Sequence, residues 1–171
     1  FQWMADFAER LVQERKQNPG EDLLSNFITA EIDGEKLLDK EVQLTVTTLI
    51  MAGIESLSGF MGMFALNLAD YPEARAALVA DPSLIPNAVE ELLRWDNPSH
   101  FLGRHSVEEV ELPSGTIPAD AHIAVVLAAA NHDERMYAEP ELLDIHRKFD
   151  RKLWFGIGPH VCIGASLARL E

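Results

Sequence analysis

The chain has 171 residues, nearly half of them hydrophobic, which is enough for one domain with a sizeable core. It carries 28 acidic and 14 basic residues, and the resulting net charge of −14 repels nucleic acids and anionic membranes. A single cysteine cannot form an internal disulfide, and the opening sequence FQWMADFAER is not a signal peptide. We therefore expect a cytoplasmic protein with no nucleic acid and no membrane among its partners.

The first third of the chain is predicted to be helical. Apolar residues recur every four positions from Trp3 to Leu11, until the NPG sequence at 18–20 breaks the pattern. A second apolar run at 23–28 predicts another helix, which the Asp33-Gly34 pair ends.

A long apolar helix is predicted from Asp39 to Asp70, with a length of about 48 Å at about 1.5 Å per residue. Between Val42 and Ala69 it carries one charge, Glu55. A helix that is apolar on all sides lies inside a protein or in a bilayer, and the polar residues along this one favour a buried central helix. A buried carboxylate needs a partner, a proton or a wet cavity, which makes Glu55 a candidate site residue.

Two shorter helices follow, and the second covers the sequence IPNAVEELLRW at 85–95. In this helix, Asn87 and Glu90 have the spacing of a capping box. Glu91 and Arg94 lie three positions apart on one face, and their spacing alone is typical of a surface ion pair.

Beyond Trp95 the sequence changes to short β-prone stretches. VEEVELPSGTIP predicts two strands joined at Pro113 to Gly115, and the apolar run HIAVVLAAA at 122–130 is either strand or helix. The fold class we expect is therefore mainly α with a small β-sheet (α+β), in a single domain over residues 1–171.

The single cysteine, Cys162, lies in the glycine-rich sequence FGIGPHVCIG at 155–164. The apolar spacing after it predicts a helix, so the thiol lies at or near a helix N-terminus, where the thiolate form is stabilised. A buried, inert side chain is the alternative for a lone cysteine. Gly156 and Gly158 allow the loop to turn sharply, and Gly164 leaves room for a broad, flat ligand close to the backbone.

FGIGPHVCIG resembles the phenylalanine-to-cysteine signature of the cytochrome P-450 haem-thiolate monooxygenases, in which the cysteine is the proximal iron ligand. Other stretches resemble further motifs of that family, in the family's order along the chain: AGIES (52–56), EELLR (90–94), AANHD (129–133) and PELLDIHR (140–147). The likeness extends from about Asn18 to the last residue. It implies a partial, helix-rich cytochrome P-450 fold of the soluble bacterial type around a long central helix, corresponding to a C-terminal-half fragment of a longer haem-binding chain.

The resemblance also implies a cofactor, haem b (iron protoporphyrin IX), with Cys162 as the metal ligand. Phe155 would pack beside the thiolate, and Arg104 and His160 would hold the haem propionates through charge-assisted hydrogen bonds. The remaining cofactor-binding residues that it implies are Ala52, Gly53, Gly156 and Gly164. By the same resemblance Glu91, Arg94 and Arg147 would form a buried structural triad, in place of the surface pair that spacing alone suggests.

The implied activity is the activation of dioxygen and the hydroxylation of a small hydrophobic substrate. Glu55 and Ser56 would be the catalytic residues, because a carboxyl and a hydroxyl can relay protons. The family usually has Thr where this chain has Ser56, so its hydroxyl is less restrained. Ile50, Met51 and the stretch 99–102 are expected to face the substrate.

Electrons would come from NAD(P)H through a ferredoxin or similar redox partner that docks on the proximal face. The stretch between positions 147 and 169 suits this role, because it holds five basic residues and a single acid on an otherwise acidic protein. The basic residues are Arg147, Lys148, Arg151, Lys152 and Arg169.

Two alternatives to a monooxygenase stay open. The first is a non-catalytic haem-thiolate protein that binds ligands or senses gas. The acid and hydroxyl at positions 55 and 56 argue against it. The second is a zinc site built from His132, His146, His160 and Cys162, whose spacings match no compact zinc motif.

Overall fold

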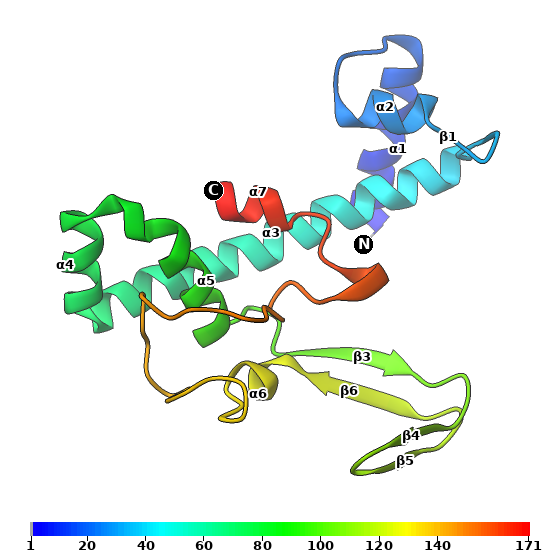
Figure 1. Cartoon of the computed structure of the whole chain (residues 1–171). Coiled ribbons are helices and arrows are strands. Elements are labelled where there is room, and N and C mark those ends of the chain that lie inside the picture. Colours follow the sequence, from blue (N-terminus) through cyan, green and yellow to red (C-terminus); the bar gives the residue numbers. More distant parts are fainter. Residues whose placement is uncertain (1) are drawn as a thin grey trace. The chain divides into compact units, whose positions relative to one another are not determined.

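The computed structural model describes residues 2–171, which form mainly helices with three small antiparallel sheets (Figure 1). The helices are α1 (Gln2–Gln17), α2 (Leu23–Thr29), α3 (Asp39–Asp70), α4 (Pro72–Ala80), α5 (Ile85–Trp95), α6 (Leu127–Asn131) and α7 (Ala165–Leu170), with short 3-10 turns η1 (Pro82–Leu84) and η2 (Gly158–His160). The strands are β1 (Glu31–Ile32), β2 (Glu35–Lys36), β3 (Phe101–His105), β4 (Val110–Leu112), β5 (Gly115–Ile117) and β6 (His122–Val126). The expected mainly α composition is confirmed.

The chain divides into two compact units, one ending at Glu55 and the other running from Ser56 to Glu171. Each unit has its own hydrophobic clusters. The single domain expected over residues 1–171 stays a prediction.

The core of the first unit joins α1 to the beginning of α3. Ala8 and Val12 pack with Val42 and Val46, and all four side chains are buried. An ion pair links the same two helices: Lys16 Nζ on α1 lies 2.8 Å from the carboxylate of Asp39, the first residue of α3.

Helix α2 is capped by Asp22, whose side chain accepts a hydrogen bond from the Ser25 amide at 2.9 Å. The Arg15 side chain, 2.5 Å away, and the Ser25 amide together lower the pKa of Asp22 to about 2. The helix ends at Thr29, earlier than predicted, because Asp33 and Gly34 form the tight turn of the β1–β2 hairpin. Both turn residues have positive φ, 53° and 85°, which an Asp-Gly pair adopts readily.

Helix α3 has the predicted bounds, but its predicted burial is wrong for this chain. Phe60 is buried on it, whereas Leu44, Ile54, Met61 and Leu66 are each more than half exposed. Burial on every side would require more packing elements than the described residues place around the helix. In length and composition α3 could also cross a membrane, a property that it shares with the core helices of soluble proteins.

The main core of the second unit forms around α5. Leu92 and Leu93 pack with Phe60, Leu143 and Trp154. The predicted capping box at the start of α5 is wrong: the residue before the helix is Leu84, which makes no side-chain cap. Asn87 instead donates to the Ile145 carbonyl at 2.7 Å and to the Arg147 carbonyl at 3.1 Å, and so ties α5 to the segment that follows α6.

Strands β3 and β6 pair from Phe101↔Val126 to His105↔His122, and β4 and β5 form a hairpin with Leu112 opposite Gly115. The predicted turn at Pro113 to Gly115 is confirmed. The apolar run at 122–130, predicted to be either strand or helix, contains both, since strand β6 is followed directly by helix α6.

Candidate functional site

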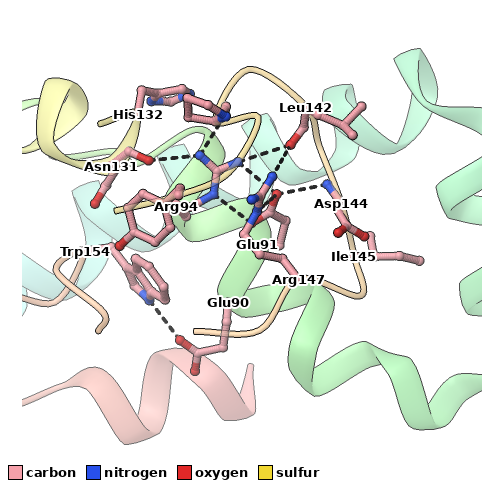
Figure 2. Close-up of polar contacts among 12 residues, drawn as sticks. Glu90, Glu91, Arg94, Asn131, His132, Leu142, Asp144, Ile145, Arg147 and Trp154 are labelled. Atoms are coloured by element: carbon pink, nitrogen blue, oxygen red, sulfur yellow. Dashed lines mark hydrogen bonds and ion pairs between the residues drawn. The ribbon is translucent and has the colours of Figure 1, made fainter. Parts of the chain in front are cut away.

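Three charged side chains meet in the interior of the second unit (Figure 2). Glu91 and Arg94 on α5 are 0% exposed. Two hydrogen bonds join them, from Arg94 Nε to Glu91 Oε2 at 2.7 Å and from Arg94 Nη2 to Glu91 Oε1 at 2.8 Å. Arg147 Nε lies 3.1 Å from both carboxylate oxygens, and the Asp144 amide donates to Oε1 at 2.9 Å. The contacts that the resemblance implied for these residues are therefore present, and they are buried rather than at the surface.

Both guanidinium groups of this triad also bind backbone carbonyls, one at the end of α6 and the others in the irregular segment that follows it. Arg94 donates to three of them and Arg147 to three, with Leu142 shared between the two. The accepting residues are Asn131, Ala138, Glu139, Pro140 and Leu142. A segment with little secondary structure of its own is thus fixed to α5 by charge-assisted hydrogen bonds.

The loop that carries Cys162 is shaped by two glycines. Gly156 and Gly158 have φ values of 71° and 75°, in the left-handed region where glycine is favoured. The loop closes on itself through a 2.8 Å hydrogen bond from the Cys162 amide to the Phe155 carbonyl. The thiol of Cys162 is free and exposed, so it is accessible and not the inert buried cysteine of the alternative interpretation.

The surroundings of the thiol fit a flat, apolar cofactor with one thiolate ligand. Ile163 is 85% exposed, and Ile157 and Val161 are also exposed, so the loop presents apolar side chains next to the sulfur. A side chain at position 164 would begin 3.9 Å from Sγ, and Gly164 leaves this space open. Haem, an apolar ring system with iron at its centre, suits such a surface.

The two residues expected to hold the haem propionates, Arg104 and His160, are both exposed. Arg104 lies on β3 and donates from Nη1 to the Gly103 carbonyl at 2.8 Å. His160 ends the η2 turn within the Cys162 loop. Among residues 2–171 no group of three or more His, Cys, Asp and Glu side chains is placed to hold a metal ion, so the zinc alternative finds no support there.

The two expected catalytic residues and two of the expected cofactor-binding residues lie together on α3. Ala52, Gly53, Glu55 and Ser56 fall within five consecutive positions, and all four are exposed. Within the first unit, Glu55 lines a pocket of about 310 Å³. Its lining residues are Met4, Ile50, Met51, Ile54 and Glu55, which include both helix residues expected to face a substrate.

A second carboxylate on α5, Glu90, has a role that the sequence did not indicate. Its Oε2 accepts from Trp154 Nε1 at 2.9 Å, and its Oε1 accepts from Arg169 Nε at 2.5 Å. Lys152 Nζ lies 3.4 Å from Oε2. Burial raises the pKa of Glu90, but the hydrogen bond and charge of Arg169 and the charge of Lys152 outweigh it, and the pKa is lowered. The feature of the sequence that could have indicated a contact of this kind is Trp154, because its indole N–H needs an acceptor when the ring is buried.

These contacts change the expected basic surface. Arg147 is bound to Glu91, and Lys152 and Arg169 are bound to Glu90. Lys148 and Arg151, the other two basic residues of this stretch, are exposed.

The cytochrome P450 family model matches residues 1–82 and 79–171. The putative cytochrome P450 133B1 of Xylella fastidiosa is 37% identical over 171 residues, which is 100% of this chain and 42% of that protein. The vitamin D(3) 25-hydroxylase of Pseudonocardia autotrophica is 39% identical over 163 residues, 94% of this chain and 40% of that protein. Among solved structures, cytochrome P450 CYP109Q5 from Chondromyces apiculatus superposes with a TM-score of 0.93 at 41% identity, covering 99% of this chain and 44% of that chain.

The chain therefore spans less than half the length of the relatives that it matches, all three of them bacterial proteins. Its fold agrees with that of cytochrome P450 CYP109Q5 over 99% of its residues. With the family model matched along its whole length, the chain belongs to the cytochrome P450 family.

Proposed function

We propose that the protein carrying this chain is a haem-dependent monooxygenase that hydroxylates a small hydrophobic substrate. The observation that carries the proposal is the Cys162 loop: an exposed thiol, held by the hydrogen bond between the Cys162 amide and the Phe155 carbonyl, among exposed apolar side chains. When bound, haem supplies the iron at which dioxygen is reduced, and a thiolate ligand donates the electron density that favours O–O cleavage.

The residues of this chain would hold the cofactor in distinct ways. Cys162 Sγ would provide the ligand atom, and the Phe155 ring would pack beside the thiolate. Arg104 and His160 provide donors for the two propionates, to which charge-assisted hydrogen bonds are stronger than neutral ones. Ala52 and Gly53 have little or no side chain and would leave room for dioxygen next to α3.

Proton delivery would be the work of Glu55 and Ser56. Both side chains are exposed, so the carboxyl can exchange protons with solvent. The serine hydroxyl both accepts and donates a hydrogen bond, which allows it to pass a proton onward.

The substrate class follows from the pocket beside α3. Met4, Ile50, Met51 and Ile54 give it an apolar lining, with Glu55 as its charged member. Such a pocket favours a hydrophobic molecule. A relative named vitamin D(3) 25-hydroxylase agrees with this class, without identifying the substrate of this protein.

The redox partner would dock beside Lys148 and Arg151. Both are exposed, and their charge suits an acidic ferredoxin that passes on electrons from NAD(P)H. Ferredoxins and NAD(P)H of this kind are found in the bacterial cytoplasm, where we also place this protein.

Oxygen-isotope labelling tests the proposal. The haem-loaded protein is supplied with NAD(P)H, a ferredoxin, a ferredoxin reductase and a panel of hydrophobic substrates under 18O-labelled dioxygen. We expect product that carries one labelled oxygen atom, and none from Cys162→Ser. Product without labelled oxygen, whose oxygen atom would then come from water, or equal product from Cys162→Ser, would contradict the proposal. A thiolate-type haem spectrum without product from any member of the panel would favour the ligand-binding or gas-sensing alternative.

A further inference from the structure

Helix α5 carries two adjacent carboxylates, which bind two different sets of side chains. Glu91 belongs to the buried triad, whereas Glu90 lies on another side of the helix, where Figure 2 shows its side chain pointing toward Trp154. Glu90 is nearly as buried as its neighbour, with 8% of its side chain exposed. A buried carboxylate is costly unless its oxygens are fully bonded, so its partners show what it holds in place.

The first partner, Trp154, lies directly before the Cys162 loop in the sequence. Its indole N–H donates to Glu90 Oε2 at 2.9 Å, and its carbonyl accepts from Asn97 Nδ2 at 3.1 Å. Its ring also packs edge-on against Phe149, with 5.1 Å between the ring centroids. The residue directly before Phe155 is therefore fixed through its side chain and its backbone.

The second partner, Arg169, lies on α7, the helix that directly follows the same loop. Its Nε donates to Glu90 Oε1 at 2.5 Å, and its guanidinium carbon lies 4.6 Å from the centroid of the Phe155 ring. This distance is typical of a cation–π contact. Glu90 thus orients the cation that covers the Phe155 ring.

The two routes converge on Phe155. One runs from Glu90 through the Trp154 side chain to the next residue along the chain, and the other runs through Arg169 to the Phe155 ring. The Phe155 carbonyl accepts the hydrogen bond of the Cys162 amide at 2.8 Å. The position of the cysteine backbone therefore depends on a residue that Glu90 holds from both ends of the loop.

We propose that Glu90 is a positioning residue for the Cys162 thiolate, which it orients through Trp154, Arg169 and Phe155. The ligand role of the thiolate rests on the proposed function. The positioning itself rests on the contacts of Glu90 alone.

Two variants separate this role from simple packing. Both oxygens of Glu90 accept hydrogen bonds, so Glu90→Gln keeps the shape of the side chain but turns an amide NH2 toward a donor. Trp154→Phe keeps an aromatic ring at this buried position and removes the indole N–H together with the second ring of the indole. Glu108→Gln makes the same chemical change at an exposed position of the same unit and is the matched control.

Hydrogen exchange of the Cys162 amide in the haem-loaded protein is the first readout. We expect exchange about tenfold faster in Glu90→Gln and several-fold faster in Trp154→Phe, with no change in Glu108→Gln. The Ser106 amide, bonded to the Ala121 carbonyl at 3.0 Å, is the internal reference. Unchanged exchange at Cys162, or an equal increase at Ser106, would overturn the proposal, because the latter result is a general loss of stability.

The absorption spectrum of the reduced, carbon-monoxide-bound protein is the second readout. We expect Glu90→Gln to lower the thiolate-ligated fraction of the bound haem at unchanged haem content, and Glu108→Gln to leave it as in the parent. An unchanged fraction in Glu90→Gln would overturn the orienting role. Retention of the thiolate signature by Cys162→Ser would instead overturn the ligand assignment, while the exchange result would still report on Glu90 itself.

Discussion

Replacing Glu91 by alanine is expected to destabilise the protein severely, although this residue lies outside the proposed haem site. The change removes the acceptor of two Arg94 hydrogen bonds, two Arg147 contacts and the Asp144 amide. Arg94 would stay behind with 0% of its surface exposed, bonded to neutral carbonyls. Breaking a buried ion pair in this way costs about 3–5 kcal/mol. Because a domain is stable by about 5–15 kcal/mol, the loss is a large share of the total.

Urea unfolding followed by circular dichroism measures this effect. With a slope of about 2 kcal/mol per molar urea, a loss of about 4 kcal/mol lowers the midpoint by about 2 M. Arg147→Ala should cost less than Arg94→Ala, because the Arg147 side chain is 9% exposed and its removal leaves Glu91 paired with Arg94. Haem content should fall with stability in both Glu91→Ala and Arg94→Ala.

Arg135→Ala is the matched control for this experiment. Arg135 pairs with Asp133 at 2.5 Å, but the Arg135 side chain is 85% exposed, so we expect no measurable shift of the midpoint. A shift for Glu91→Ala as small as that of Arg135→Ala would refute the argument that the triad is held by buried charge.

Folding lowers the pKa of Asp22 to about 2, chiefly through the hydrogen bond from Arg15. The contribution of Asp22 to stability is therefore present above the usual carboxylate pKa and is lost as the pH falls toward about 2. An NMR titration midpoint of Asp22 near the usual carboxylate value would contradict this. Ser56→Thr should raise the product formed per reducing equivalent by several-fold at most, because a β-branched side chain restrains the hydroxyl; an equal or lower yield would show that the serine is already well oriented. Replacing both Lys148 and Arg151 by Gln should raise the ferredoxin KM several-fold at low salt and little at high salt. A salt-independent difference would exclude electrostatic docking at these two residues.

The features that sequence analysis predicted correctly have local signals. The bounds of α3 follow from an unbroken apolar run, and the β4–β5 turn follows from Pro113 and Gly115. The loop around Cys162 follows from glycines at positions where only glycine adopts the backbone conformation easily. Each of these signals lies within a few residues of the structure that it predicts.

The features that it missed depend on residues far apart in the chain. Glu90 has local capping-box spacing, but its partners Trp154 and Arg169 lie 64 and 79 positions away. The pairing of Lys152 and Arg169 with Glu90 was also missed, because charge patterning does not show which cations contact a buried acid. The end of α2 was placed too late because an Asp-Gly pair ends a helix and forms a hairpin turn equally well. The exposure of α3 likewise depends on what packs against it, which its own sequence does not contain.

The central claim is that Cys162 is the thiolate ligand of haem iron, and the spectrum of the reduced, carbon-monoxide-bound protein tests it most directly. The parent protein should show the thiolate-type spectrum, and Cys162→Ser should lose it, because an alcohol is not deprotonated near neutral pH as a thiol can be. Haem should still associate with the apolar surface of the Cys162→Ser variant, so that its altered spectrum reports the ligand and not the loss of cofactor. A thiolate-type spectrum that persists in Cys162→Ser would contradict the claim.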